Sequence, residues 1–184
     1  MKKRVFLLVG PPGIGKTTII AKTAATVKAE GYTVGGMITQ ESRLCGTRVG
    51  FSVTDVYSGK QEWLAHVNYE TGVRFGKYHV DVEALDAVGV KAVMFALENC
   101  DVIVIDEVGP MELFSANFRM ATRSALQSSK MLLGVVHWKA RDALIDNAKS
   151  REDAEVIDVT YENRDRLPEE LATRILALLS AKAH

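Results

Sequence analysis

The feature that most constrains the fold is a loop rich in glycine and proline, placed between an apolar run and a helical pattern. Residues 5–9 are all apolar, which predicts a buried strand, and the residues after Lys16 have the apolar spacing of a helix. Between them runs Gly-x-x-x-x-Gly-Lys-Thr, from Gly10 to Thr17. A strand, this loop and a helix in that order are typical of the Walker A phosphate-binding loop.

Each residue type in the loop suits the binding of a polyphosphate. Glycines allow the backbone to approach closely, so that N–H groups and the positive end of the helix dipole face the phosphate oxygens. Lys16 would reach the β- and γ-phosphates and act in catalysis, and the hydroxyl of Thr17 would ligate Mg²⁺. The predicted nucleotide-binding residues of the loop are Gly10, Pro11, Pro12, Gly13, Ile14, Gly15, Lys16, Thr17 and Thr18.

Length and composition limit the remaining possibilities. A chain of 184 residues suggests a single domain over 1–184. Basic and acidic residues number 23 each, so no global field favours nucleic acid or an anionic membrane as a partner. Cys45 and Cys100 are far apart in sequence, which predicts free thiols in a reducing cytosol. We expect a cytoplasmic protein, monomeric and without nucleic-acid or membrane partners.

Strand and helix patterns alternate along most of the chain, which predicts an α/β fold: a three-layer sandwich with a mainly parallel sheet and helices on both faces. An antiparallel β-meander is expected as an insertion at about 33–67, and residues 68–80 are expected to be irregular. Asp81 and Pro168 have the positions of helix starts. The strands are predicted at 5–9, 33–39, 48–53, 61–67, 101–105, 131–136 and 156–160, with helices after Gly15 and Asp81, at 115–128 and 140–149, and from Pro168.

Two acids directly follow the apolar strand 101–105. At that edge Asp106 fits the Walker B role of holding Mg²⁺, and Glu107 fits the role of polarising the attacking water. An acid after an apolar run is often only a helix cap. The Walker A loop in the same chain favours the metal and base roles.

Two further polar segments are candidates for ligand contact. His137 follows the strand 131–136, which we expect between the two Walker strands, so it would lie beside the γ-phosphate as a sensor, or alternatively cap the next helix. After the last strand, Asn163 and Arg164 would contact the nucleobase through hydrogen bonds and stacking that tolerate many bases. A charged turn is the alternative for this second segment.

An arginine finger is not identifiable from sequence. A P-loop site without one hydrolyses at roughly 10⁻⁴–10⁻² per second, and a finger contributes about 10³–10⁵. Slow turnover is therefore predicted. Candidates within the chain are Arg43, Arg48, Arg74, Arg119 and Arg123, with Lys77 as a lesser one.

With these residues in place, the chain resembles the THEP1 nucleoside-triphosphatase family of P-loop NTPases, which includes the cancer-related nucleoside triphosphatase of animals. The resemblance is carried by residues 10–18, 48–51, 76–78, 102–109, 111–114 and 162–165. It implies Mg²⁺-dependent hydrolysis of ATP, GTP, CTP or UTP to the diphosphate and phosphate. It also implies nucleotide contacts along the second Walker strand and turn, at Val102, Ile103, Val104, Ile105, Asp106, Glu107, Val108 and Gly109.

Two other functions stay open. A P-loop kinase acting on a small nucleoside or nucleotide would need an acceptor pocket, and no dense arginine lid is visible in the sequence. A nucleotide-dependent switch would use hydrolysis as a timer, with the β-meander as its partner surface.

Overall fold

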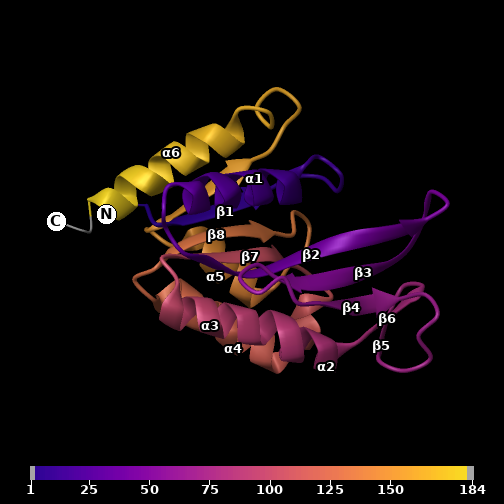
Figure 1. Ribbon diagram of the computed structural model, residues 1–184. Helices are drawn as coiled ribbons and strands as arrows, with labels where there is room; N and C mark the ends of the chain where they lie inside the picture. The colour runs from indigo at the N-terminus through magenta and orange to yellow at the C-terminus, as the bar shows by residue number, and fades with distance from the viewer. Residues whose placement is uncertain (1–2, 182–184) are drawn as a thin grey trace.

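The computed structural model describes residues 3–181 and places the strands of that range in one sheet between two layers of helices (Figure 1). The order across the sheet is β5-β6-β4-β3-β2-β7-β8-β1-β9. The strands are β1 (Val5–Val9), β2 (Val34–Leu44), β3 (Thr47–Asp55), β4 (Gln61–His66), β5 (Val73–Phe75), β6 (Tyr78–Val80), β7 (Val102–Val108), β8 (Met131–Val136) and β9 (Ala154–Asp158).

The parallel half of the sheet consists of β2, β7, β8, β1 and β9. Its central strands β1 and β8, and the first part of β7, are continuous apolar runs because helices cover both faces. As predicted, β8 lies between the two Walker strands β1 and β7, and β9 borders β1. The carboxyl ends of all five strands therefore meet at one edge, where ligands bind in open α/β sheets.

The antiparallel extension consists of β3, β4, β6 and β5, added outside β2. The predicted meander is present, but the expectation that residues 68–80 are irregular is wrong. Two strands of three residues form there, and Gly76, with φ of 59°, makes the tight turn between them. Strands this short carry too little periodicity to be recognised in sequence.

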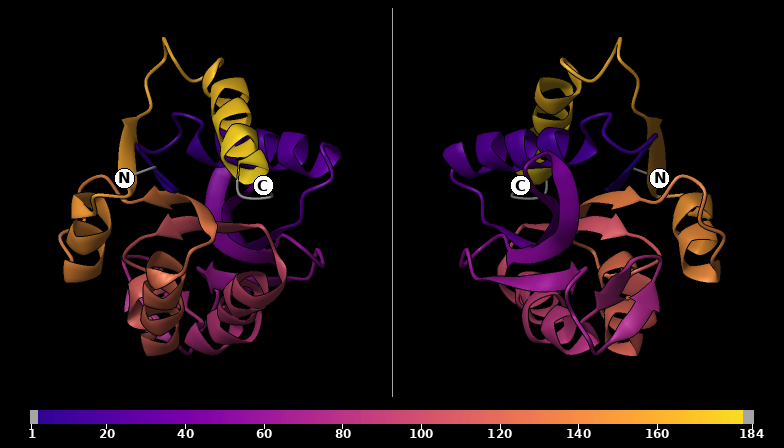
Figure 2. Two further views of the ribbon diagram at one scale, coloured as in Figure 1. Left: turned by 90° about the vertical axis from the view of Figure 1, so that its left-hand side faces the viewer. Right: turned by 90° about the vertical axis from the view of Figure 1, so that its right-hand side faces the viewer.

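The helices divide into two layers on opposite faces of the sheet (Figure 2). α1 and α6 pack with one apolar cluster, which includes Phe6 and Leu133, and the other helices pack with a second cluster, which includes Met37 and Ile105. The helical segments are α1 (Lys16–Ala29), α2 (Val82–Ala84), α3 (Lys91–Asn99), α4 (Ala116–Gln127), α5 (Ala143–Ser150) and α6 (Leu167–Ser180), with a π-helical turn η1 (Leu85–Val90) and a 3₁₀ turn η2 (Glu112–Phe114).

The predicted helix starts follow from local hydrogen bonds. The Asp81 carboxylate accepts from the backbone N–H of Ala84 at 2.9 Å, and Ser115 accepts from that of Phe118 at 2.9 Å, so each satisfies a donor that the first turn leaves free. Pro168 lies in the first turn of α6. α2, η1 and α3 run on as one rod beneath the extension (Figure 1).

Several predicted strand boundaries differ from the structure, three of them by enough to matter for the site or the sheet. β2 continues to Leu44 because β3 pairs with it beyond the end of β7, and β7 continues to Val108, so both Walker B acids belong to the strand. β9 begins at Ala154, two residues before the predicted start, because β1 provides its pairing partner. Pairing across the sheet, which sequence does not specify, sets these ends.

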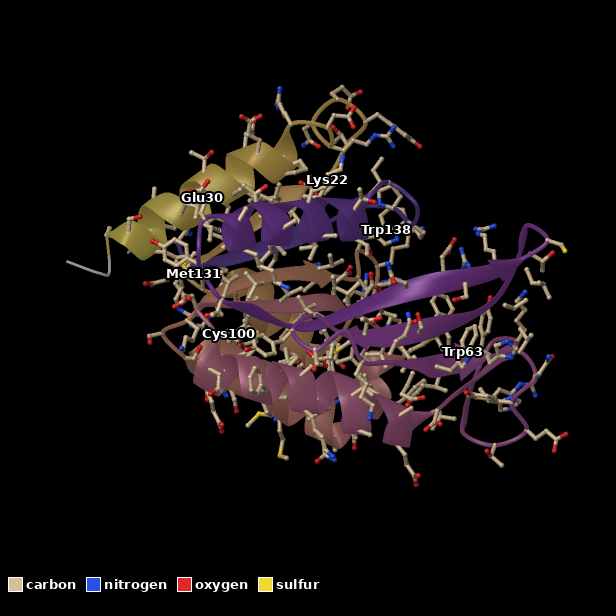
Figure 3. All side chains as sticks on the ribbon, in the orientation of Figure 1. Lys22, Glu30, Trp63, Cys100, Met131 and Trp138 are labelled. Atoms are coloured by element: carbon tan, nitrogen blue, oxygen red, sulfur yellow. The ribbon has the colours of Figure 1, made fainter. Side chains whose placement is uncertain are left out.

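Among residues 3–181, no helix is both long enough and apolar enough to cross a bilayer. Both cysteines are free, with Cys45 exposed at the β2–β3 turn and Cys100 buried before β7. Cys100 and Met131 lie at the amino ends of β7 and β8, and Trp138 lies at the opposite end (Figure 3).

Candidate functional site

The Walker A loop connects β1 to α1 with a backbone that only glycine adopts easily. Gly13 and Gly15 have φ of 78° and 111°, and a side chain on either would be strained whatever the space around it. Gly15 is the residue before the helix and offers no side-chain cap. The first N–H groups of α1 are therefore left for a ligand, as a phosphate site requires.

Lys16 lies folded over this loop. Its ammonium group donates to the carbonyl oxygens of Gly10 at 2.8 Å and Pro11 at 3.1 Å. Burial lowers the pKa of Lys16, and the nearby carboxylates of Glu107 and Asp106 oppose that shift. The group thus stays close to both Walker B acids without a direct ion pair to either.

Asp106 is deeply buried, with 2 % of its surface exposed. Burial raises its pKa to about 7, although a hydrogen bond with Thr17 favours the ionised form. Its Oδ2 atom is buried and has no hydrogen-bond partner. A buried oxygen without a partner, beside a hydroxyl, provides ligands of the hard type that Mg²⁺ prefers.

Asp106 Oδ2 and the hydroxyl oxygen of Thr17 are a small set of protein ligands of the kind that Mg²⁺ uses. Within residues 3–181 no group of three or more His, Cys, Asp or Glu side chains is placed to hold a metal ion. Mg²⁺ in phosphate-transfer sites needs only one or two protein ligands, because phosphates and water complete its shell. Thr17 and Asp106 therefore fit the predicted metal role.

Glu107 and His137 meet at the end of β7 and β8. The register between these strands shifts between Ile105 and Val108, which turns the two acids out of the regular ladder. Burial raises the pKa of Glu107, while charge on His137 and Lys16 opposes the shift. His137 also accepts two hydrogen bonds at Nδ1, from the N–H groups of Lys139 at 3.3 Å and Ala140 at 3.0 Å. The start of α5 is capped by Asp142 rather than by this histidine.

A second buried acid, Glu112, lies beside Glu107. Glu112 is 1 % exposed, and burial with the charge of Glu107 raises its pKa to about 8. Thr39 donates to its Oε1 at 3.4 Å. A Cβ atom at Gly109 would lie 2.6 Å from Glu107 Oε1 and 3.1 Å from Glu112 Oε2, so only glycine lets the two carboxyl groups approach.

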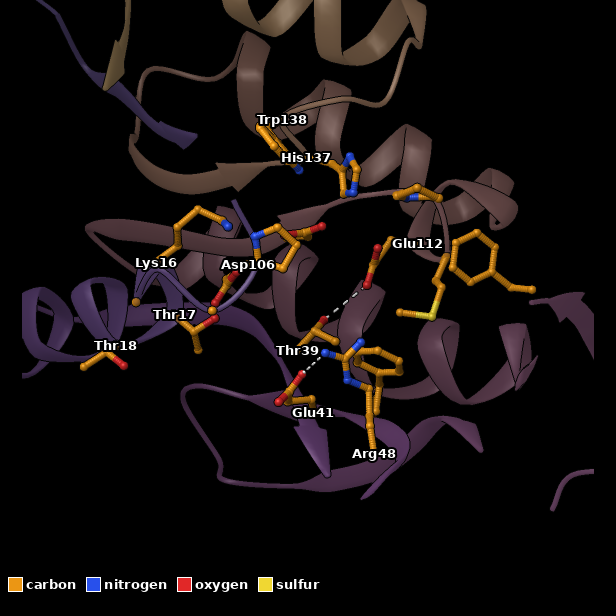
Figure 4. Close-up of a pocket in the computed structure, with 18 residues that line it drawn as sticks. Lys16, Thr17, Thr18, Thr39, Glu41, Arg48, Asp106, Glu112, His137 and Trp138 are labelled. Carbon is orange, nitrogen blue, oxygen red and sulfur yellow. Dashed lines mark hydrogen bonds and ion pairs between the residues drawn. The ribbon is translucent and has the colours of Figure 1, made fainter. Parts of the chain in front are cut away.

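One cleft of about 460 Å³ joins these groups to the antiparallel extension (Figure 4). Figure 4 shows Lys16 and Thr17 on one side, with Thr39, Glu41 and Arg48 across from them. The Walker side is lined by Pro12, Gly13, Gly15, Lys16, Thr17, Thr18, Asp106, Glu107, His137 and Trp138, and the other side by Thr39, Glu41, Arg48, Phe51, Phe75, Pro110, Met111 and Glu112.

Not every predicted nucleotide residue lines this cleft. Within the stretch 102–109 only Asp106 and Glu107 line the cleft. The others are residues of β7 or, for Gly109, of the turn after it. Val102, Ile103, Val104 and Ile105 are at most 1 % exposed in the interior of β7. Gly10, Pro11 and Ile14 support the loop from outside the cleft lining. Their assignment as nucleotide contacts stays a prediction.

The predicted base contacts lie on the far side of the Walker A loop. Asn163 uses its amide locally, accepting from Thr160 N–H and donating to Asp158 C=O, both at 2.8 Å. The Arg164 guanidinium stacks over the ring of Tyr161 at 4.8 Å and donates to Ile14 C=O at 3.5 Å. The structure thus brings Arg164 to the loop and uses Asn163 to shape the turn.

Sequence reasoning missed most of the extension side. Glu112 was within reach, because it lies in the Met-Glu-Leu-Phe segment after the Walker B turn. Thr39, Glu41 and Phe75 carry no motif of their own. They join the site only because β2 extends past β7 and the extension turns back toward the cleft.

The chain is similar in sequence to known nucleoside-triphosphatases. A family model described as NTPase matches residues 5–172. The nucleoside-triphosphatase THEP1 of Thermofilum pendens is 45 % identical over 181 residues, which cover 98 % of this chain and 100 % of the relative.

Two solved structures share the fold. The crystal structure of THEP1 from Aquifex aeolicus has a TM-score of 0.81 at 28 % identity, covering 97 % of this chain and 99 % of that one. The solution structure of a human cancer-related nucleoside triphosphatase has a TM-score of 0.79 at 35 % identity, covering 95 % and 98 %. The predicted fold class and family resemblance are confirmed.

Proposed function

Because this chain belongs to the NTPase family, we propose that it is a Mg²⁺-dependent nucleoside-triphosphatase that acts on ATP, GTP, CTP and UTP. It cleaves the γ-phosphate to give the diphosphate and phosphate, with broad base choice and slow turnover. The observation that supports this most is the buried, unpartnered Oδ2 of Asp106 beside Thr17 at the mouth of the Walker A loop.

The chain's own groups divide the work. Lys16 would exchange the carbonyl oxygens of Gly10 and Pro11 for β- and γ-phosphate oxygens, since a charged acceptor makes the stronger hydrogen bond. Thr17 and Asp106 would hold Mg²⁺, which supplies neutralisation of phosphate charge. Glu107 orients the attacking water and accepts its proton.

Two groups at the rim complete the proposal. His137, at the end of β8, would contact the γ-phosphate as a sensor while its Nδ1 stays engaged by the following turn. Arg164 would stack on the base, and a stacking contact accepts any base because every base has a π-face. Asn163 would complete that contact at the base edge.

Phosphate release tests the proposal directly. Purified protein should release phosphate from all four nucleoside triphosphates with Mg²⁺ and lose activity with excess EDTA. Glu107→Gln should bind ATP but lose about 10²–10⁴-fold in kcat, because the general base is gone. Lys16→Ala should lose both binding and turnover. Lys22→Ala, an exposed lysine of α1, is the matched control. Wild-type turnover in Glu107→Gln would contradict the base role.

The same assay separates the two alternatives. A kinase would consume nucleoside triphosphate only when an acceptor is added, and a switch would retain one partner in the triphosphate state alone. Turnover in buffer with nucleotide and Mg²⁺ as the only additions argues for hydrolysis as the reaction.

The chain's surroundings are also a matter of proposal. We expect a monomer in the cytoplasm, with nucleoside triphosphates as its partners. Light scattering behind a sizing column and cell fractionation test these two points.

A further inference from the structure

The cleft offers few cationic side chains to a polyphosphate ligand. Lys16 and Arg48 are the permanently cationic side chains that line it. Four acids share the same lining, namely Glu41, Asp106, Glu107 and Glu112. A nucleoside triphosphate brings further negative charge, so each cation in reach of the phosphates is valuable in a partly desolvated site.

Arg48 has a hydrogen-bond donor that no acceptor of the protein uses. It comes from the start of β3 and turns into the cleft (Figure 4). One terminal nitrogen pairs with Glu41 Oε2 at 2.7 Å, and the guanidinium lies 5.6 Å from the centre of the Phe51 ring. Its Nε atom is buried and has no hydrogen-bond partner. A buried donor without an acceptor calls for an explanation, and a ligand oxygen is one.

A continuous run of polar groups leads from Arg48 to the attacking position. Glu41 and Thr39 are two residues apart on β2, so both face the same side of the sheet. Thr39 donates to Glu112, and Glu112 and Glu107 flank Gly109. A guanidinium released from Glu41 thus moves along groups that are already polar, toward the carboxylate that orients the water.

Four of the other five cationic candidates have partners of their own, and the fifth, Arg123, does not line the cleft. Arg119 makes two hydrogen bonds to Asp142, at 3.1 and 2.8 Å, and Arg74 bonds to Gly76 C=O. Lys77 donates to the backbone carbonyl of Arg48 at 3.0 Å. Arg43 pairs with the other oxygen of Glu41 at 2.7 Å. Of the six candidates, Arg48 is the one that lines the cleft.

We propose that Arg48 is an arginine finger supplied within the chain. In the transition state its guanidinium separates from Glu41 and binds γ-phosphate oxygens. The proposal rests on the hydrolysis proposed above. The water oxygen forms a bond to the γ-phosphorus as the bond to the bridging oxygen breaks. The diphosphate leaves with that electron pair, and the water proton passes to Glu107. Arg48 changes no covalent bond; its N–H groups stabilise the charge that develops.

The first test is the split between turnover and ground-state binding. Arg48→Ala should lower kcat for ATP about 10²–10³-fold, as loss of one transition-state donor does. Its affinity for ADP with aluminium fluoride and Mg²⁺ should fall by a similar factor, while its affinity for ATP changes little. Arg48→Lys, which keeps the charge but not the planar fork, should fall between.

Two neighbouring variants distinguish a direct contact of Arg48 with the phosphate from a structural role of its ion pair with Glu41. Arg43→Ala removes the other arginine on Glu41 and should keep wild-type turnover, because Arg43 lies outside the cleft lining. Glu41→Gln removes the holding charge and should keep or increase kcat. Loss of activity in Glu41→Gln equal to that in Arg48→Ala would mean that the ion pair is structural and would overturn the proposal.

The outcomes also distinguish this proposal from the one it rests on. If Glu107→Gln is inactive and Arg48→Ala loses less than tenfold in kcat, the finger is wrong and hydrolysis stands. If ATP affinity of Arg48→Ala falls as far as kcat, Arg48 is only a ground-state contact and the finger is again wrong. If Glu107→Gln turns over like wild type, the hydrolytic proposal itself fails.

Discussion

The parallel half of the sheet and the antiparallel extension contribute to the cleft in different ways. The parallel strands β1, β7 and β8 end at one edge and deliver Lys16, Asp106 and His137 by topology alone. The extension delivers Arg48 through a hairpin that runs past that edge. Under the proposed function, the parallel half would hold the phosphates and the metal, and the extension would cover the side from which water attacks.

The two halves also differ in burial. All residues of β1 and β8 are buried, because helices cover both faces. The extension buries one face, which includes Val53, Leu64 and Val80, against η1 and the helices around it. Its other face carries the half-exposed Trp63 (Figure 3). Sequence alternation is therefore typical of the extension, and unbroken apolar runs are typical of the parallel half.

The largest expected effect lies in β2, the strand of the parallel half that borders the extension. Gly36 of β2 has φ of 115°, and a Cβ atom there would lie 2.0 Å from the carbonyl oxygen of Val104 in β7. Gly36→Ala should cost about 3 kcal/mol or more of unfolding free energy, from backbone strain together with the clash. Urea denaturation measures it.

Gly31→Ala is the matched control for Gly36→Ala. Gly31 has φ of 87° but no atom near the position of a Cβ. Only the strain of about 1–2 kcal/mol should remain. Equal costs for Gly31→Ala and Gly36→Ala would show that the close contact between β2 and β7 adds nothing to the cost at Gly36.

Core truncations compare the two halves with the same chemical change. Leu133 of β8 and Leu64 of β4 are both fully buried. Each Leu→Ala substitution should cost about 2–5 kcal/mol, because each leaves a cavity. Leu44→Ala, at the 67 % exposed hairpin end, should stay within about 0.5 kcal/mol. A cost below about 1 kcal/mol for Leu64→Ala, measured by the same denaturation, would mean that the extension is not part of the common core.

The stability of the protein should fall as the pH rises, because of Glu112, the buried acid of the cleft on the side of the extension. Burial raises its folded pKa from 4.5 to about 8, so the folded protein retains a proton that the unfolded chain releases. Stability from this group is complete below pH 4.5, declines by at most about 1.4 kcal/mol per pH unit, and is lost above pH 8.

Glu112→Gln removes this pH dependence. Its stability relative to wild type should increase between pH 5 and 8 and then level off, as measured by thermal unfolding across that range, and Glu98→Gln on the exposed side of α3 is the control. A constant difference between Glu112→Gln and wild type would show that Glu112 is ionised in the folded protein.

The smallest expected effect concerns the proposed contact of Arg164 with the nucleobase. Arg164→Ala should weaken nucleotide binding by about two- to fivefold, equally for the four bases, because a stacking contact is worth roughly 0.5–1 kcal/mol. Arg166→Ala, whose arginine pairs with Glu170 at the start of α6, is the control. Titration calorimetry with each triphosphate measures both. A loss confined to one base would contradict stacking as the mode of contact.

The sequence by itself determined the Walker A loop, the order of strands and helices, and the two acids after the apolar run. Each is a local signal: glycine spacing, apolar period and an abrupt change from apolar to acidic residues. The helix starts at Asp81, Ser115 and Pro168 are likewise local, since a cap acts on donors three residues away.

Only the tertiary structure decided which distant residues complete the site. Arg48 and Glu112 enter the cleft because β3 pairs with β2 beyond the end of β7, and because Gly109 lets two carboxyl groups approach. The two short strands of 68–80 exist only through pairing, of β6 with β4 and of β5 with β6. Strand pairing joins residues far apart in sequence, so no local pattern encodes it, and the desolvation that raises the pKa of Glu112 arises only once the chain has folded.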